Sequence, residues 1–292
     1  MIRELVVVSG KGGTGKTSIT ACLALLANRP VVVADCDVDA SDLHLLLTPD
    51  ERERHDFHSG HLAVIAGNKC IGCGLCHVNC GFGAVGRVDS ATGDPVFFVD
   101  PMACQGCGVC VRFCPAGAVD FPERHCGHWM VSDTRAGVMV HARLGPAGEN
   151  SGKLVSTVRR EARRLAAETG SDLVIADGPP GTGCPVIASI TGATMVLAVT
   201  EPTVSGEHDL ERVLSLSGHF GIPAVVCVNK WDLNPEMAER IEKMASGMNA
   251  FPAGRIRYDP EFTRAQMLAK TVIDTEAPGS EDIRCLWKAL DL

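Results

Sequence analysis

The 292-residue sequence has no run of about 18 consecutive apolar residues, so we expect no membrane-spanning helix and no stable membrane anchor. Basic residues are also few: 27 Lys and Arg stand against 35 Asp and Glu, for a formal net charge of -8. Since nucleic acid binding needs a basic face, this balance disfavours a nucleic acid partner. The opening MIRELVVVSGKGG has a short apolar run that leads into glycines and a lysine. It predicts a first β-strand rather than a secretion signal, and we expect a cytoplasmic protein.

Cysteine, in contrast, is abundant, with 14 residues. Eight of them fall in two regular runs, which indicates metal ligands rather than disulfides. The other six are scattered, form no CxxC pair, and are each interpreted as a small buried hydrophobic residue. These six are Cys22, Cys36, Cys126, Cys184, Cys227 and Cys285.

Apolar strands alternate with helices along most of the chain. Residues 5–9 and 31–35 have the composition of buried strands, and residues 16–28 between them are helical in pattern. Strand, helix and strand at these spacings predict a βαβ unit with a parallel sheet. The alternation resumes with a helix over 151–170, which begins at a serine and stops at a glycine. Further strands are predicted at 173–177, 195–199, 224–229 and 254–256.

A segment rich in cysteine and glycine, residues 61–125, interrupts this alternation. Because removing it leaves one continuous α/β pattern, we interpret it as an insertion. We therefore expect a doubly wound α/β domain with a mostly parallel sheet, formed by residues 1–60 and 126–292, and a small inserted α+β domain. HCGH at 125–128 matches no standard metal-binding spacing, and we expect a loop there. The C-terminal SEDIRCLWKALDL predicts a helix packed on the core rather than a membrane foot.

The segment Gly10–Thr17 matches the phosphate-loop pattern G-x-x-x-x-G-K-[ST] and lies between a predicted strand and a predicted helix. Its backbone N–H groups would surround phosphate oxygens, Lys16 would reach the β- and γ-phosphates, and Thr17 would supply an oxygen to Mg²⁺. The alternative is a glycine-rich turn that binds nothing. The predicted nucleotide-binding residues here are Gly12, Gly13, Thr14, Gly15, Lys16, Thr17 and Ser18.

A second lysine at the start of this loop, Lys11, makes KGGTGKT resemble the deviant Walker A motif of the MinD/ParA/Mrp and nitrogenase iron-protein group of P-loop ATPases. In that group two subunits face each other across two ATP molecules. The resemblance implies an ATP-dependent dimer, either of this chain or with a similar ATPase, in which Lys11 contacts the partner's nucleotide.

Two carboxylates extend the resemblance. It places a first switch at ADCDVDASDLH, where Asp37 would orient the attacking water. It places a second switch at DLVIADGPPGTG, where Asp177 would contact Mg²⁺ through water. Lys11, Lys16, Asp37 and Asp177 are therefore the candidate catalytic residues of an ATPase.

The motif residues expected to bind the base match two different nucleotide families. NKWD at 229–232 matches the pattern that selects guanine in GTPases, but the resembling group also has an asparagine at this strand end, in contact with adenine. Since the first lysine of the phosphate loop favours ATP over GTP, we assign Asn229 to adenine. RIRYDPEF at 255–262 resembles the segment that packs on the base, with Arg257 where proline is common.

The two cysteine runs share the spacing C-x₂-C-x₂-C-x₃-C and lie 34 residues apart, so they resemble the internal repeat of a two-cluster bacterial ferredoxin. In such ferredoxins the fourth cysteine of each run ligates the other cluster. Zinc is the alternative, but zinc sites use pairs of CxxC rather than triplets. Gly81 replaces the proline expected after the first run, so we expect a looser backbone there. One 4Fe–4S cluster is predicted on Cys70, Cys73, Cys76 and Cys114, and the other on Cys104, Cys107, Cys110 and Cys80.

Together these motifs resemble MinD-superfamily ATPases that carry an inserted two-cluster ferredoxin domain. The resemblance implies nucleotide-gated metallocluster assembly, or electron delivery, to a small metallocluster-accessory or acceptor protein. The first alternative is a MinD-like positioning or scaffold protein whose clusters are structural or sensory. An Mrp-type cluster carrier is disfavoured because the chain has no C-terminal CxxC. A reductase that uses ATP to drive low-potential electrons stays open.

Cys184 follows Asp177 by seven residues, a distance at which the nitrogenase iron protein has a cysteine that binds a cluster shared by two subunits. That arrangement needs a second cysteine from each subunit, for which Cys126 is the nearest candidate. A buried thiol beside the nucleotide is the favoured interpretation of Cys184.

Overall fold

The computed structural model describes residues 2–89, 95–145, 148 and 151–292. The chain divides into two compact units. The first comprises Met1–His55, Trp129–Arg143 and Ser151–Leu292, and the second comprises Asp56–His128 and Leu144–Asn150. The predicted insert, residues 61–125, lies within the second unit.

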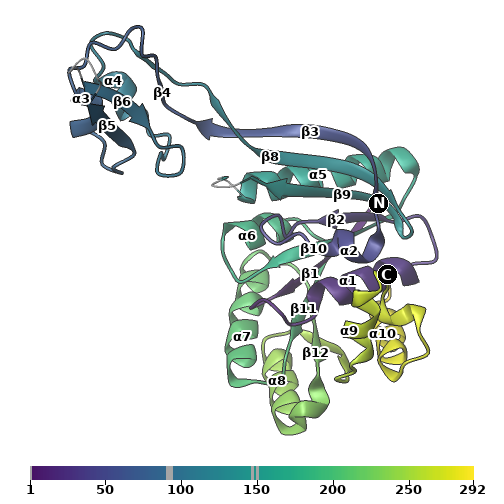
Figure 1. The fold of residues 1–292 in the computed structure, drawn as a ribbon. Helices are drawn as coiled ribbons and strands as arrows, with labels where there is room; N and C mark the ends of the chain where they lie inside the picture. The colour runs from purple at the N-terminus through teal and green to yellow at the C-terminus, as the bar shows by residue number, and fades with distance from the viewer. Residues whose placement is uncertain (1, 90–94, 146–147, 149–150) are drawn as a thin grey trace. The chain divides into compact units, whose positions relative to one another are not determined.

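A mostly parallel sheet forms the centre of the first unit (Figure 1). The pairings from β13 through to β9 are parallel, as predicted for a doubly wound α/β fold. The central strand β1 is buried along nearly its whole length, since a parallel strand covered on both faces needs a continuous apolar run. Within the described residues the order is β13 (Phe251–Ile256), β12 (Ala224–Asn229), β11 (Met195–Thr200), β1 (Arg3–Ser9), β10 (Leu173–Pro180), β2 (Val32–Asp35), β9 (Gly137–Leu144), β8 (Glu123–Thr134) and β3 (Asp50–His61).

Helices cover both faces of this sheet (Figure 1). On one face, α1 (Lys16–Leu26), α2 (Leu43–Leu47) and α10 (Pro278–Ala289) bury Leu23, Leu47 and Leu286 in one core cluster. The prediction that the C-terminal helix packs on the core is thus confirmed. No helix in the described part of the chain is long and apolar enough to cross a membrane. The other helices of this unit are α5 (Ser151–Thr169), α6 (Cys184–Ile190), α7 (Val204–His219), α8 (Pro235–Gly247) and α9 (Glu261–Met267), with 3₁₀ turns η1 (Trp231–Leu233) and η2 (Val272–Asp274).

Three strands of this sheet, among the described residues, were not expected from the sequence: β3, β8 and β9. The sequence of β3, DERERHDFHSGH, is mostly exposed and polar because β3 is the last strand of the sheet, so it carries no apolar alternation. The expectation of a loop at 125–128 is wrong, because these residues belong to β8. The strands β3 and β8 each continue from the first unit into the second.

The second unit repeats one small motif. Two short antiparallel pairs join β4 (Val64–Ile65) with β7 (Val119–Asp120) and β5 (Val85–Asp89) with β6 (Pro95–Val99). Two four-residue helices, α3 (Leu75–Val78) and α4 (Val109–Arg112), begin after Gly74 and Gly108, and both glycines have a φ of 73°. Since side chains disfavour this left-handed conformation, the repeated glycines are a backbone requirement of each cysteine run.

A buried ion pair joins β1 to α5. Arg159 donates to both carboxylate oxygens of Glu4, at 2.7 Å each, and to the carbonyls of Ala188 and Thr191 at 2.8 and 2.9 Å. Glu4 and Arg159 are only 2% and 5% exposed. Arg163 also donates to Glu4. Removing one member of such a pair leaves a buried charge without compensation.

We expect Arg159→Ala to lower the free energy of unfolding by about 3 kcal/mol, the lower end of the range for broken buried pairs because Arg163 still reaches Glu4. The matched control is Arg160→Ala on the same helix, whose exposed pair with Glu161 contributes less than about 1 kcal/mol. Urea denaturation of both variants measures the difference. Equal unfolding free energies for the two variants would contradict the assignment.

Candidate functional site

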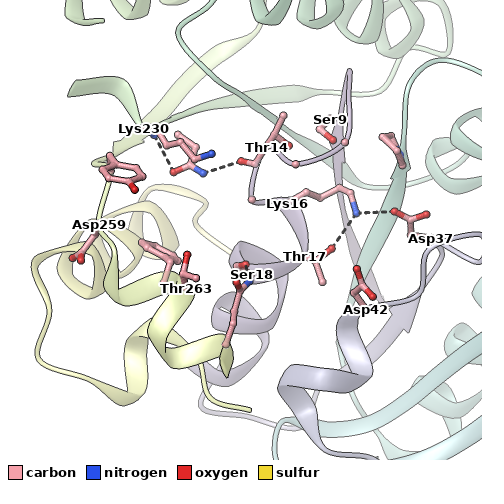
Figure 2. A pocket seen from close by; sticks show the side chains of 18 of the residues that line it. Ser9, Thr14, Lys16, Thr17, Ser18, Asp37, Asp42, Lys230, Asp259 and Thr263 are labelled. Carbon is pink, nitrogen blue, oxygen red and sulfur yellow. Dashed lines mark hydrogen bonds and ion pairs between the residues drawn. The ribbon is translucent and has the colours of Figure 1, made fainter. Parts of the chain in front are cut away.

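The phosphate loop lies between β1 and α1, at the carboxyl ends of the parallel strands, and lines a cleft of about 460 Å³ (Figure 2). Gly13 and Gly15 have φ values of 80° and 88°, so the loop uses glycine where the backbone must turn left-handed. All of the predicted loop residues from Gly12 to Ser18 line this cleft, together with Asp37, Asn229 and others. The volume is in the range of small-molecule sites.

Lys16 lies at the base of this cleft and is only 6% exposed. Its Nζ donates to Asp177 Oδ1 at 2.9 Å and lies 3.4 Å from Asp37 Oδ2. Burial acts to lower the pKa of Lys16, but attraction from the surrounding carboxylates outweighs it and raises the pKa above the ordinary 10.5. Lys16 therefore carries a permanent positive charge that is available to phosphate oxygens.

Asp177, which lies within β10, is completely buried and accepts from three side chains of α1. Besides Lys16, these are Thr17 Oγ1 at 2.7 Å and Thr20 Oγ1 at 3.0 Å. The hydroxyl of Thr17 and the carboxylate of Asp177 are the oxygens predicted to hold Mg²⁺, one directly and one through water. Their juxtaposition fits that role, since Mg²⁺ prefers oxygen ligands and keeps several waters.

Two more carboxylates follow β2. Asp35 is fully buried and accepts from Ser41 Oγ at 2.7 Å. Burial and repulsion from Asp177 raise the pKa of Asp35 to about 8. Burial also raises the pKa of Asp37, while Lys16 opposes that shift. One ammonium group thus faces three carboxyl groups, and the site has a deficit of positive charge.

Lys11 has a different environment from Lys16. Its Nζ lies 3.3 Å from Ser205 Oγ and 3.6 Å from Glu201 Oε2, at the start of α7. Its side chain is 35% exposed, and Lys11 is not among the described residues that line the cleft. Its ammonium therefore points away from the nucleotide cleft of its own chain.

At the far end of the cleft, Asn229 Nδ2 donates to the carbonyl of Thr14 at 2.8 Å and fixes the phosphate loop to β12. Asp232 accepts the backbone N–H of Tyr258 at 2.6 Å and is not among the described residues that line the cleft. One oxygen of this carboxylate is thus engaged by the backbone, and Asn229 Oδ1 in turn accepts the backbone N–H of Lys230 at 3.0 Å. Among the described residues, the cleft is also lined by some that were given no role from the sequence: Ala40, Asp42, Lys230, Thr263 and Gln266.

The eight motif cysteines line two cavities of the second unit, among the described residues. One cavity is bordered by Cys70, Cys73, Cys76 and Cys114, and the other by Cys80, Cys104, Cys107 and Cys110. Each set takes three cysteines from one run and the fourth from the other run. Four sulfur ligands around one small cavity fit a cubane cluster by donor type and number.

Backbone N–H groups point at the sulfur atoms of the two fourth cysteines. Ala84 N–H donates to Cys80 Sγ at 3.3 Å, and Ala118 N–H donates to Cys114 Sγ at 3.2 Å. Burial acts to raise the pKa of Cys80, but the N–H groups of residues 82–85 together outweigh it, so the pKa lies below the ordinary 9.0. Such N–H groups favour a thiolate, the form that binds metal.

The scattered cysteines divide into two groups. Cys22, Cys36, Cys126 and Cys227 are buried, as expected. Cys184 and Cys285 are exposed, so the interpretation of these two residues as buried thiols is wrong. Cys184 is the first residue of α6, directly after the second-switch loop. Cys126 belongs to the second unit and Cys184 to the first.

The family described as the CobQ/CobB/MinD/ParA nucleotide binding domain matches residues 5–272 of this chain. The protein MJ0578 of Methanocaldococcus jannaschii is 32% identical over 237 residues, which cover 80% of each chain. Among solved structures, the septum site-determining protein MinD of Pyrococcus horikoshii, complexed with Mg-ADP, is similar with a TM-score of 0.57 at 17% identity and covers 100% of this chain and 96% of its own. The MinC:MinD cell division complex of Aquifex aeolicus gives 0.56 at 17% identity, over 99% of this chain and 96% of the other.

The raised pKa of Asp35 predicts a pH dependence of stability in the nucleotide-free protein. The folded state holds a proton on Asp35 up to about pH 8, whereas the unfolded chain releases it near 3.8, so this group makes stability fall as pH rises between the two values. The free energy of unfolding of Asp35→Asn, relative to that of wild type, should therefore rise by at least about 1.4 kcal/mol between pH 5 and pH 8. This lower bound is the effect of a difference of one bound proton over one pH unit.

Urea denaturation at pH 5, 6.5 and 8 measures this gain. The control is Asp39→Asn in the same loop, where the carboxyl group is exposed and the difference from wild type should stay constant. A constant difference for Asp35→Asn as well would show that the buried carboxyl is ionised throughout.

Proposed function

Because the chain belongs to the CobQ/CobB/MinD/ParA family of nucleotide-binding domains, we propose that it is a Mg²⁺-dependent ATPase that uses ATP to control metallocluster transfer or electron delivery to a partner protein. The observation that carries the proposal is the presence in one chain of two sites. One is a cleft with a buried Lys16–Asp177 pair, and the other is a pair of cavities with four cysteines each.

In the cleft, each polar group has a separate task. Lys16 and the loop N–H groups bind and orient the phosphates, since the lysine charge is fixed and the loop is already folded. Thr17 and Asp177 would hold Mg²⁺, which would neutralise phosphate charge when bound. Asp37 is placed beside Lys16 and orients the attacking water.

The position of Lys11 supports a two-subunit mechanism. A lysine that contacted the nucleotide of its own chain would line the cleft, whereas Lys11 lies against Ser205 and Glu201 outside it. The Lys11 side chain is partly exposed and is held by one hydrogen bond to Ser205 and a 3.6 Å ion pair with Glu201, so it can move to a neighbouring subunit at a modest cost. We infer that Lys11 completes the ATP site of a second, similar chain.

In the second unit, the two four-cysteine sets would each hold one 4Fe–4S cluster, which would supply one-electron redox chemistry. The cysteine sulfurs bind the irons, and the N–H groups aimed at Cys80 and Cys114 stabilise the charge on the sulfur ligands. Three-plus-one ligation ties the two halves of the repeat together, since each cavity takes sulfur atoms from both runs.

The chain itself supplies the connection between the two activities. The first-switch segment that contains Asp37 leads through α2 into β3, and β3 continues into the second unit. We infer that a change in the position of Asp37 with nucleotide state would be passed along this short covalent path of structured residues. This path supports ATP control of the cysteine unit.

A MinD-like positioning or scaffold function is the second candidate, because the similar solved structures include a MinD protein in complex with MinC. The two functions differ in what a partner receives. A positioning protein binds its partner in response to ATP and transfers neither iron nor electrons. Partner binding with an unchanged cluster content and potential in all nucleotide states would favour this candidate.

ATP-dependent association tests the two-subunit mechanism. Asp37→Ala should bind ATP but lose turnover by about 10²-fold or more, since a group that positions the reacting water is removed, and it should accumulate as an ATP-bound dimer. Adding Lys11→Ala should abolish this dimer in sedimentation velocity while the monomer still binds ATP. Lys243→Ala, an exposed lysine of α8, is the control. If the Lys11→Ala, Asp37→Ala protein dimerised like the single variant, the site would belong to one chain.

Iron analysis tests the cluster assignment. Anaerobically isolated protein should contain about eight irons in two cubanes. Cys70→Ser with Cys114→Ser removes two ligands of one set and should leave about four irons. Cys70→Ser with Cys80→Ser removes two cysteines of one run, but they belong to different sets, so both clusters should be damaged. Cys285→Ser, an exposed thiol outside both sets, should change nothing. Zinc in place of iron would overturn the assignment. A greater loss of iron from Cys70→Ser with Cys114→Ser than from Cys70→Ser with Cys80→Ser would also overturn it.

A further inference from the structure

Three potential metal ligands that are far apart in the sequence meet in the second unit. Asp56 lies on β3, and His125 and His128 lie on β8. One ligand atom from each residue can be chosen so that all three lie within 4.8 Å of one another. None of these residues belongs to the cysteine-lined cavities. We propose that they form a mononuclear site for a divalent transition metal of the Zn²⁺ class.

The distances fit such an ion. Asp56 Oδ1 lies 3.0 Å from His128 Nδ1 and 3.6 Å from His125 Nε2. Two ligand atoms that are about 2.0–2.1 Å from a Zn²⁺ ion at a tetrahedral angle lie roughly 3.3 Å apart. The two observed separations bracket this value, and all three ligand atoms lie within 4.8 Å of one another, so side-chain rotations would bring them to one ion.

His128 Nδ1 supplies an independent indication. The atom is shielded from solvent and forms no hydrogen bond of acceptable geometry with any described residue, although Asp56 Oδ1 lies nearby. A buried imidazole nitrogen normally has a partner, and one without a partner requires an explanation. A metal ion between the nitrogen and the carboxylate would satisfy both atoms.

The backbone of β8 makes this arrangement possible. Residues three apart on a regular strand point to opposite faces, yet the rings of His125 and His128 lie with centroids 4.7 Å apart. Gly127, between them, has a φ of 152°, which interrupts the alternation and needs glycine. Cys126 Sγ donates to the carbonyl of Ser59 at 3.2 Å, so the same short segment is tied to β3.

The site is open enough to exchange metal. The side chains of Asp56, His125 and His128 are 62%, 46% and 37% exposed. Two imidazoles and one carboxylate leave at least one coordination position of a tetrahedral ion free for water or an outside ligand. Arg124, beside His125, donates to the carbonyls of Cys104 and Pro101, so the strand that carries the site is fixed to the second cysteine run. Metal binding would clamp β3 to β8 where the chain enters and leaves the cysteine unit.

Titration with Co²⁺ tests the site, using the full chain with its cysteine sites loaded as isolated anaerobically. Since Co²⁺ bound by nitrogen and oxygen lacks the intense charge-transfer band of thiolate ligation, its spectrum separates this site from any cysteine site. We expect one equivalent of Co²⁺ without that band, displaced by one equivalent of Zn²⁺.

His128→Ala, and separately Asp56→Asn, should weaken this binding by more than the 10–100-fold that is typical of losing an outer partner of a metal ligand, with an unchanged iron content. The control is His219→Ala, a histidine of α7 outside the site. Unchanged iron shows that the variants are folded, whatever the outcome of the ATPase tests. Absence of the extra equivalent in the wild-type chain, or equal binding by all of the variants, would overturn the proposal.

Discussion

The buried carboxylate of Asp177 is the constraint on which the nucleotide site depends. It lies in β10, in the middle of the sheet, and accepts hydrogen bonds from Lys16, Thr17 and Thr20, all on the first turns of α1. These bonds fix α1 against the sheet, and α1 in turn fixes the loop before it. Because the carboxylate is completely buried, its charge requires these partners, and the geometry of the loop follows from that requirement.

The same group sets the electrostatics of the cleft. Asp35, Asp37 and Asp177 surround the single ammonium of Lys16, and burial together with repulsion from Asp177 raises the pKa of Asp35 despite the opposing effect of that ammonium. A polyphosphate alone would add to the excess of negative charge, whereas a divalent cation bound with it would offset part of that added charge. The arrangement therefore suits a metal–nucleotide complex better than a free nucleotide, which agrees with Thr17 and Asp177 as neighbours.

The second unit, which contains the eight motif cysteines, needs another source of stability because it is too small for a large apolar core. Its core clusters include cysteines beside a few apolar side chains such as Ala63 and Val119. Each cysteine set spans both halves of the repeat, so clusters bound there would cross-link the unit in place of a larger core. The Asp56–His125–His128 site would add a third link, at the strands through which the chain enters and leaves.

Much of this protein is determined by local sequence. The apolar runs fix the parallel strands β1, β2, β10, β11 and β12, because a strand buried on both faces cannot be polar. The phosphate loop and the cysteine spacing likewise carry their chemistry within a few residues, since the loop groups surround one cleft and the first three cysteines of each run border one cavity.

Only the tertiary structure decided the rest. The polar edge strand β3 is held by its neighbour β8 and has no periodic signal of its own. HCGH matches no metal-binding spacing because its third ligand, Asp56, comes from about 70 residues earlier, and Gly127 alters the face of the strand. Whether Lys11 points into its own cleft, and whether Asp232 is available to a base, depends on Glu201 and Tyr258, whose positions follow from packing and not from the motifs themselves.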